Sequence, residues 1–262
     1  MTFGIWAMFL SIADYCWRER TALTRFGAIP FFVVAIVTFL TPTPTKDSSA
    51  REWMMLALMA LLQSVCYLPV TVAWYRKVVL GDGGVSGRPA FTLGRREGRL
   101  FLWQAAFLAV SLALLIAAAG IVAGLFYSFV WVSAAMAAAV CVIAGVILFL
   151  AWFSVLNRLG MILVLVATDQ PVSFSTSWEL TRGFTWPLLG TLVLLIIAGI
   201  LGGLAGELIA KPFSGQLFGT WVKAVFDAGV GLVTLIATAT LFGFTYLRIT
   251  QARGAVSKAA AS

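Results

Sequence analysis

The chain has 262 residues, of which 61% are apolar and 11% are charged, with no histidine and a formal net charge of +8. A soluble domain is roughly half apolar and about a quarter charged, so this composition excludes an ordinary soluble domain and indicates a chain surrounded mostly by lipid. Without histidine there can be no histidine-ligated haem, histidine zinc site or histidine general base, and three isolated cysteines indicate neither a disulfide framework nor a metal cluster.

The first apolar segment, residues 3–18, is too short to cross a bilayer. In a helix, Ser11, Asp14 and Arg18 share one face, and the apolar residues Ile5 and Ile12 lie on another. This pattern predicts an amphipathic helix in the membrane interface. A first helix that is simply buried against the rest of the protein is the alternative.

Six membrane-spanning helices follow in chain order. Their expected positions are near residues 23–40, 53–75, 100–125, 128–156, 186–206 and 226–247. The run without charge from Leu100 to Leu156 is too long for one span, so we expect a short turn near Gly120, Gly124 and Ser128. The expected fold is an all-α polytopic membrane protein, one membrane domain over residues 1–262 with its six spans paired as three hairpins.

The basic residues are distributed unequally between the two sides of these spans. Only four of the 18 Lys and Arg residues fall on one side: Lys46, Arg51, Lys211 and Lys223. The positive-inside rule then places both termini in the cytoplasm. The positive charge is therefore a topology signal, and we expect no nucleic-acid partner.

A short motif occurs at the entry to two spans. Leu23-Thr24-Arg25 is followed by four residues and Pro30, and Leu180-Thr181-Arg182 is followed by four residues and Pro187. The repetition predicts that the first and third hairpins resemble each other in parallel orientation. Arg25 and Arg182 thereby become candidate contacts to anionic lipid headgroups or to a partner.

A second interfacial helix is expected over residues 173–182. Thr176 and Glu179 have capping-box spacing, and Gly183 can end the helix in a left-handed conformation. The pattern turns Ser175, Glu179 and Arg182 toward water. It turns Phe174, Trp178 and Thr181 toward the membrane.

Three residues of this region are candidate lipid or partner contacts. Trp178 and Trp186 suit the headgroup level of the bilayer, and Arg182 is positioned to meet a phosphate. A plain interfacial anchor is the alternative to a headgroup or partner site.

The fifth and sixth spans contain the remaining candidates. Gly199 and Gly203 form one of two overlapping GxxxG patterns, which favour close helix packing either within this protein or against a partner's helix. Asp227 lies at the edge of the sixth span and is a candidate for an ion path. A local ion pair with Lys223, four residues away, is the alternative.

Two segments carry a resemblance to known proteins. Residues 68–82 (LPVTVAWYRKVVLGD) and 171–190 (PVSFSTSWELTRGFTWPLLG) resemble multi-pass, alphaproteobacterial-type inner-membrane proteins. Those proteins look related to the integral membrane domain attached to some glycerophosphodiester phosphodiesterases. The resemblance implies a bacterial inner-membrane location. It transfers no catalytic residue, because the soluble phosphodiesterase barrel is absent here and the membrane part of that family has no assigned chemistry.

These observations favour a non-catalytic accessory, assembly or scaffold subunit of a bacterial inner-membrane complex, without a cofactor. A small transporter or lipid-handling protein is the alternative. We do not expect an enzyme, because an intramembrane enzyme needs a nucleophile beside a base, and the chain offers no histidine and few carboxylates.

Overall fold

The structure is a computed structural model that describes residues 4–41, 49–85, 93–213 and 215–261, the last of these without side chains from residue 253. The described part of the chain contains eight α-helices: α1 (Ile5–Arg18), α2 (Arg20–Leu40), α3 (Ala50–Leu80), α4 (Arg95–Phe129), α5 (Ala134–Ala167), α6 (Phe174–Leu180), α7 (Thr185–Ala210) and α8 (Leu217–Ala261). Single 3₁₀ turns follow α3 at Asp82–Gly84 and α7 at Lys211–Phe213.

Six of these helices, α2, α3, α4, α5, α7 and α8, are long and apolar enough to cross a membrane. Each needs about 20 apolar residues for the crossing, and all six exceed that length. The chain is therefore an all-α, multi-pass membrane protein, and this prediction from the sequence is confirmed.

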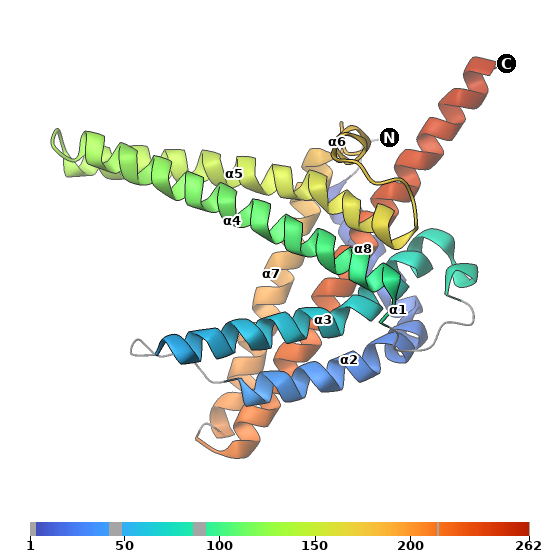
Figure 1. Ribbon diagram of the computed structural model, residues 1–262, viewed down its shortest axis with the longest axis horizontal. Coiled ribbons are helices and arrows are strands. Elements are labelled where there is room, and N and C mark those ends of the chain that lie inside the picture. Colours follow the sequence, from blue (N-terminus) through green and yellow to red (C-terminus); the bar gives the residue numbers. More distant parts are fainter. Residues whose placement is uncertain (1–3, 42–48, 86–92, 214, 262) are drawn as a thin grey trace.

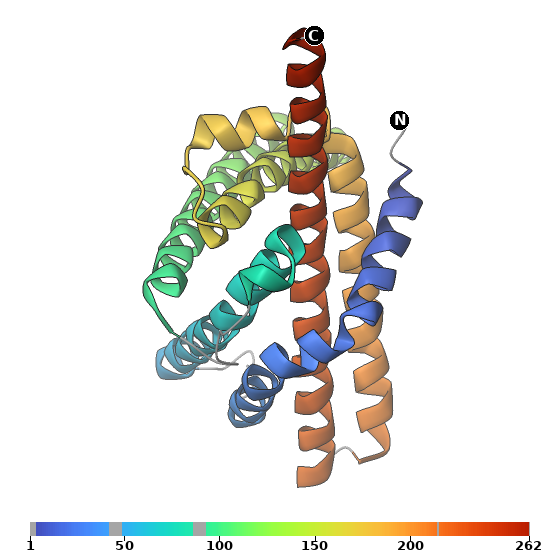
Figure 2. The ribbon, with the colours of Figure 1, turned by 90° about the vertical axis from the view of Figure 1, so that its right-hand side faces the viewer.

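The six spans pack as three hairpins, α2 with α3, α4 with α5 and α7 with α8. Figure 1 shows the hairpins diverging from one region of the molecule, with the α4–α5 hairpin running away from the upright α7–α8 hairpin. Helix α8 is the centre of the arrangement, because it packs against α2, α3 and α7 (Figure 2). Both termini lie toward the same end of the molecule, as six spans require.

The largest buried side chains lie where the hairpins converge. Trp74 of α3, Met161 of α5, Leu188 of α7 and Leu241 of α8 are each at most 1% exposed. They belong to one apolar cluster, which joins four helices that are distant in the sequence. Burial of these side chains fixes the hairpins to one another at this end.

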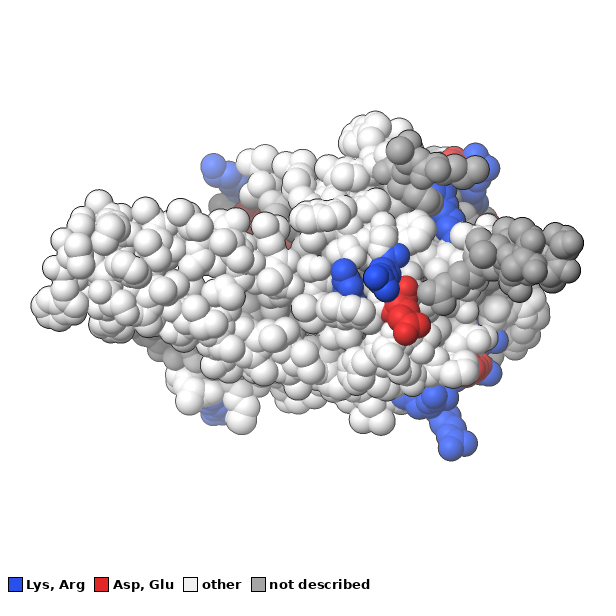
Figure 3. Space-filling view, turned by 90° about the horizontal axis from the view of Figure 1, so that it is seen from above, with Lys and Arg blue, Asp and Glu red and all other residues white. Residues whose placement is uncertain are grey.

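The α4–α5 hairpin contributes little to this core. In its most apolar stretches only 6% of the residues are buried, against 44% for α8. Figure 3 shows that the part projecting to the left carries no charged side chain on this face. At its tip, Tyr127 and Trp131 are 71% and 89% exposed. The hairpin thus presents most of its length to its surroundings.

The turn between α4 and α5 lies at residues 130–133, a few residues later than the expected position near Gly120, Gly124 and Ser128. Both glycines lie within α4, because a glycine in an apolar helix weakens it without ending it. The helix break comes instead at Ser133, whose hydroxyl accepts a hydrogen bond from the amide of Met136 and so starts α5.

Helix α5 ends at Ala167, eleven residues beyond the expected end of the span at 156. Its last part, residues 159–167, is its most deeply buried, with Met161, Val164 and Ala167 fully enclosed. The helix continues past Asn157-Arg158 because the apolar residues after this polar pair pack into the core, and the predicted end of the membrane span near 156 stays a prediction.

The two copies of the Leu-Thr-Arg motif occupy different structures. Leu23-Thr24-Arg25 lies inside α2, and Pro30 lies in the middle of that helix. Leu180-Thr181-Arg182 instead spans the end of α6, and Pro187 is the third residue of α7, where proline fits the first turn. The repeat in the sequence therefore does not correspond to a repeat in local structure.

Helix α1 has features both of an interfacial amphipathic helix and of a helix buried against the rest of the protein. Met8 and Ile12 are buried, and the helix packs against α7 and α8. Trp6 and Trp17 are 61% and 70% exposed on its outer surface. Helix α1 is thus docked on the bundle and also presents the amphipathic aromatic side chains that favour a membrane interface.

Candidate functional site

Charged side chains from distant segments meet where α3, α4 and α5 converge. Asp169, just after α5, accepts hydrogen bonds from Arg96 Nε at 2.8 Å and 3.0 Å and from Arg76 Nη1 at 3.1 Å. Arg76 also donates to the carbonyl oxygens of Gly84 and Ala167. We call Arg76, Arg96 and Asp169 the polar junction; it links the end of α3, the start of α4 and the end of α5.

The geometry of Asp169 is set by its place in the turn after α5. Its φ is +59°, in the left-handed region that aspartate tolerates better than most residues. Partial burial alone would raise the pKa of its carboxyl group, but the hydrogen bonds and positive charges of Arg96 and Arg76 outweigh that effect and lower the pKa below its ordinary value. Asp169 is therefore a carboxylate that neutralises two arginines.

Lys77 joins α3 to the start of the chain in the same region. It forms ion pairs with Glu19, at 3.1 Å, and with Asp82, and its side chain is 9% exposed. Because a buried ammonium is costly without a counter-charge, these carboxylates let Lys77 lie inside the junction of α1, α2 and α3. The arrangement is structural in character: it holds helix ends together.

The segment after α5 folds differently from the sequence prediction in two respects. Helix α6 begins at Phe174, with Ser173 as its N-cap residue, so the predicted capping box of Thr176 and Glu179 is not where the helix starts. The prediction that Thr181 faces the membrane is also wrong, because Thr181 is fully buried together with Ser177. Ser177 donates its hydroxyl proton to the carbonyl oxygen of Arg158, which fixes α6 on α5.

Two other features of this segment agree with the sequence prediction. Gly183 has a φ of +88°, which only glycine adopts without strain, and it follows the end of α6. Trp178 is 44% exposed and Phe174 is 52% exposed, so both apolar side chains are partly accessible at the surface of the protein.

Trp178 is covered by Arg158, a residue that is not among the candidates predicted from the sequence. The guanidinium carbon of Arg158 lies 4.2 Å from the centre of the Trp178 ring, within cation–π range. Sequence reasoning missed Arg158 because it placed this residue in a loop beyond the span. The sequence does contain a signal for this residue, because Arg158 is the first charged residue after more than 50 uncharged residues.

Asn157, the neighbour of Arg158, is 2% exposed, and neither its amide nitrogen nor its amide oxygen has a hydrogen-bond partner among the described residues. Arg158 Nε is likewise buried without a partner. Unpaired buried polar atoms are costly in an apolar environment, so this is the least satisfied polar region that the structure describes.

The predicted headgroup contacts are accessible in the structure. Trp186 is 73% exposed, at the start of α7. Arg182 is exposed and forms no ion pair with the described residues. Arg25 is exposed beside Phe26, with its guanidinium carbon 5.4 Å from that ring centre. Their contact to lipid or to a partner stays a prediction.

The glycines of the fifth span have two different environments. A Cβ atom on Gly199 would lie 3.2 Å from Thr234 Oγ1, so Gly199 faces α8. A Cβ atom on Gly203 would have no other atom within 4 Å, so Gly203 faces away from the protein. Internal packing thus accounts for Gly199, and a contact to a partner's helix stays open for Gly203. Gly199 also lines an apolar groove of about 460 Å³ between α2, α7 and α8.

Asp227 lies in a small ion network at the far end of the α7–α8 hairpin. Its carboxylate is 3.5 Å from Lys223 Nζ, and Lys223 also pairs with Glu207 of α7 at 3.1 Å. Lys223 therefore forms a bridge between α8 and α7. With 34% of its side chain exposed, Asp227 is partly accessible, and its role in an ion path stays a prediction.

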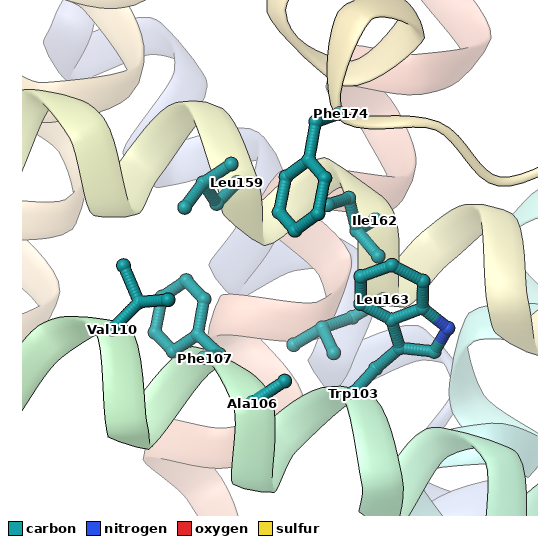
Figure 4. Close-up of a pocket in the computed structure, with 8 residues that line it drawn as sticks. All are labelled: Trp103, Ala106, Phe107, Val110, Leu159, Ile162, Leu163 and Phe174. Carbon is teal, nitrogen blue, oxygen red and sulfur yellow. The ribbon is translucent and has the colours of Figure 1, made fainter.

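A small apolar pocket lies between α4, α5 and α6 (Figure 4). Its volume is about 10 Å³, which leaves no room for a ligand. The Trp103 and Phe174 rings close it edge to face, with centres 5.4 Å apart. This contact seats α6 on the α4–α5 hairpin. In the described part of the chain, no group of three or more histidine, cysteine or carboxylate side chains could hold a metal ion.

No protein-family model, curated protein sequence or solved structure matches this chain. The fold alone defines the class of protein, a multi-pass membrane protein with six apolar helices. The relationship to the membrane domain of glycerophosphodiester phosphodiesterases stays a prediction.

Proposed function

We propose that the protein is a non-catalytic accessory, assembly or scaffold subunit of a bacterial inner-membrane complex, and that the α4–α5 hairpin is its docking element. The observation that supports this most directly is the projection of that hairpin, which packs on the rest of the protein at one end only (Figure 1). A long hairpin with no charge between residues 100 and 157 and with a free lateral surface is suited to contact the spans of another subunit.

Small residues on α4 support the same role. Ala113, Ala117, Gly120 and Gly124 are all exposed and recur at intervals of three or four residues, which places them on one face of the helix. Neither glycine has an atom within 4 Å of the position of a Cβ atom, so this face is not used for packing onto α5. Helices in lipid associate closely through such faces.

The proposed orientation has both termini in the cytoplasm. It is supported by the excess of Lys and Arg on that side and by the position of both termini at one end of the molecule. Cysteine labelling tests it in a variant without native cysteines. A cysteine at Ser86, which lies outside the described residues, should resist an impermeant reagent in intact cells, and one at Val132 should react. The reverse pattern would contradict the proposed orientation.

Purification of the tagged protein in a mild detergent, followed by native mass spectrometry, tests the accessory role. We expect a stoichiometric complex with larger membrane subunits. Gly120→Leu combined with Gly124→Leu should abolish that complex and leave the protein itself folded, because both side chains would extend into unoccupied space.

Gly203→Leu tests the alternative docking face on α7, because a side chain added there would also meet no atom of the protein within 4 Å of its Cβ position. We expect it to leave the complex intact. A wild-type protein that is purified alone would contradict the accessory role, and equal loss of the complex in both variants would contradict the assignment of docking to α4.

The second candidate is a small transporter or lipid-handling protein, favoured by the groove of about 460 Å³ beside Gly199. Its lining is apolar, which suits an acyl chain. In reconstituted vesicles, lipid or ion flux should then depend on the protein, and Asp227→Asn should change an ion flux. Unchanged flux in that variant would exclude Asp227 from the path.

A further inference from the structure

We propose that Arg158, stacked on Trp178, binds the phosphate of an anionic phospholipid in the cytoplasmic leaflet. The site combines a guanidinium group, a tryptophan ring and a position at headgroup depth. It depends on the membrane location of the protein and on the orientation proposed above, but is independent of the accessory role, so either proposal can fail without the other.

The depth of Arg158 follows from the packing of α4 against α5. Trp152 donates from Nε1 to Ser111 Oγ at 3.2 Å, and Cys141 donates to the carbonyl oxygen of Val122 at 3.5 Å. This antiparallel register, continued along both helices, places Arg158 level with Ala105. Arg158 is therefore about 9 Å closer to the hairpin tip than Arg99, the first charge of α4 to flank the uncharged run.

The distance from the tip of the hairpin matches the thickness of a bilayer. Along α5, Ser133 and Arg158 are separated by about 38 Å at 1.5 Å per residue. The hydrocarbon layer is about 30 Å thick, and the bilayer with its headgroups is about 40–45 Å. With the exposed rings of Tyr127 and Trp131 at the outer surface, Arg158 lies in the inner headgroup layer, where lipid phosphates are found.

Arg158 is also available to bind an anion. It has no carboxylate partner among the described residues, in contrast to Arg76 and Arg96, which share Asp169. Its Nε is buried and so is not accessible to a ligand, which leaves the two Nη groups as the donors, and its guanidinium carbon lies over the Trp178 ring. A guanidinium group that is oriented in this way can donate two hydrogen bonds to a phosphate.

Two further aromatic side chains lie at the same level. Trp103 of α4 contacts Phe174 of α6 edge to face, directly beside the α5–α6 contact (Figure 4). Indole rings favour the region between headgroups and acyl chains. The surroundings of Arg158 therefore suit an amphipathic ligand with a phosphate group and acyl chains better than a small soluble anion.

The test is native mass spectrometry of the full-length protein, released from nanodiscs that contain equal amounts of phosphatidylglycerol and phosphatidylcholine. We expect the wild type to retain phosphatidylglycerol preferentially, and Arg158→Gln to lower that preference about tenfold. Arg158→Lys keeps the charge but cannot stack on the ring or donate two hydrogen bonds in one plane, so we expect an intermediate loss of the lipid preference. We expect this variant to fold even if Arg158→Gln is unstable.

Arg20→Gln is the matched control, because Arg20 also lies over a tryptophan, Trp17, at 5.3 Å. That pair is exposed, so its loss should leave lipid retention unchanged. Equal retention in Arg158→Gln, Arg158→Lys and the wild type would overturn the proposal, as would an equal loss in Arg20→Gln. Displacement of the lipid by millimolar inorganic phosphate would also overturn it, in favour of a soluble anion.

Discussion

Trp74 of α3 donates a hydrogen bond from Nε1 to the hydroxyl oxygen of Thr240 in α8, at 2.8 Å, and both side chains are completely buried. The same hydroxyl oxygen lies 3.6 Å from the Cys16 sulfur of α1 and donates to the carbonyl oxygen of Ile236. One hydroxyl group thus connects three helices inside an apolar cluster. Burial raises the pKa of the Cys16 thiol, so this contact is made by the neutral group.

Thr240→Val should destabilise the protein by about 1–3 kcal/mol. Valine has nearly the shape of threonine, but it leaves the indole N–H of Trp74 without a hydrogen-bond acceptor. Thr240→Ser should restore most of this loss. Thermal unfolding in detergent measures the effect. Thr245→Val is the control: that hydroxyl is also buried, but it donates only to Leu241 of its own helix. A loss in Thr245→Val as large as that in Thr240→Val would contradict the special role of the contact.

The stability of the polar junction should depend on pH through Asp169. Because its pKa is lowered in the folded protein, its carboxylate contributes stability above the pKa of the unfolded chain, and this contribution disappears as the pH falls through the folded pKa. The unfolding temperature should therefore decrease below about pH 4. Arg76 and Arg96 then repel each other without a counter-charge.

Asp169→Asn should lower the unfolding temperature at neutral pH. It should also make the unfolding temperature less sensitive to a decrease in pH. Asparagine also tolerates the left-handed backbone conformation, so the change removes the charge without backbone strain. Asp14→Asn, which breaks an exposed pair with Arg18, should change neither property appreciably. An unchanged acid response in Asp169→Asn would show that other groups determine it.

Asn157→Leu should stabilise the protein by about 1–3 kcal/mol. The substitution replaces a buried amide, whose two polar atoms have no partner among the described residues, with an apolar side chain of similar size. Chemical or thermal unfolding in a defined detergent measures the change. Destabilisation would mean that the amide meets a polar group of a lipid or of another subunit in the membrane.

Gly160→Ala should destabilise the contact between α5 and α8, because the added methyl group would overlap the ring of Phe242. Gly120→Ala is the matched comparison within the same hairpin. It adds a methyl group in open space and should stabilise α4 by up to about 1 kcal/mol through its higher helix propensity. Effects of the same sign in both variants would contradict the close approach of α5 and α8 at Gly160.

The class of the protein was determined by the sequence itself. Long apolar runs that are separated by charged or turn-forming residues can only be buried in lipid as helices, so the six spans and their pairing as hairpins could be predicted. The left-handed residue after α6 could also be predicted, because glycine has a local conformational preference at Gly183 that does not depend on distant contacts.

Only the tertiary structure decided which polar residues meet. Asp169 contacts Arg76 and Arg96 across 93 and 73 positions of sequence, and no periodic pattern encodes such a pairing. Hydropathy was equally unable to show that α5 continues past Arg158 into the core or that Thr181 is covered by protein. Lipid and protein interiors are both apolar, so the sequence shows which side chains avoid water, and packing alone decides which of the two surrounds them.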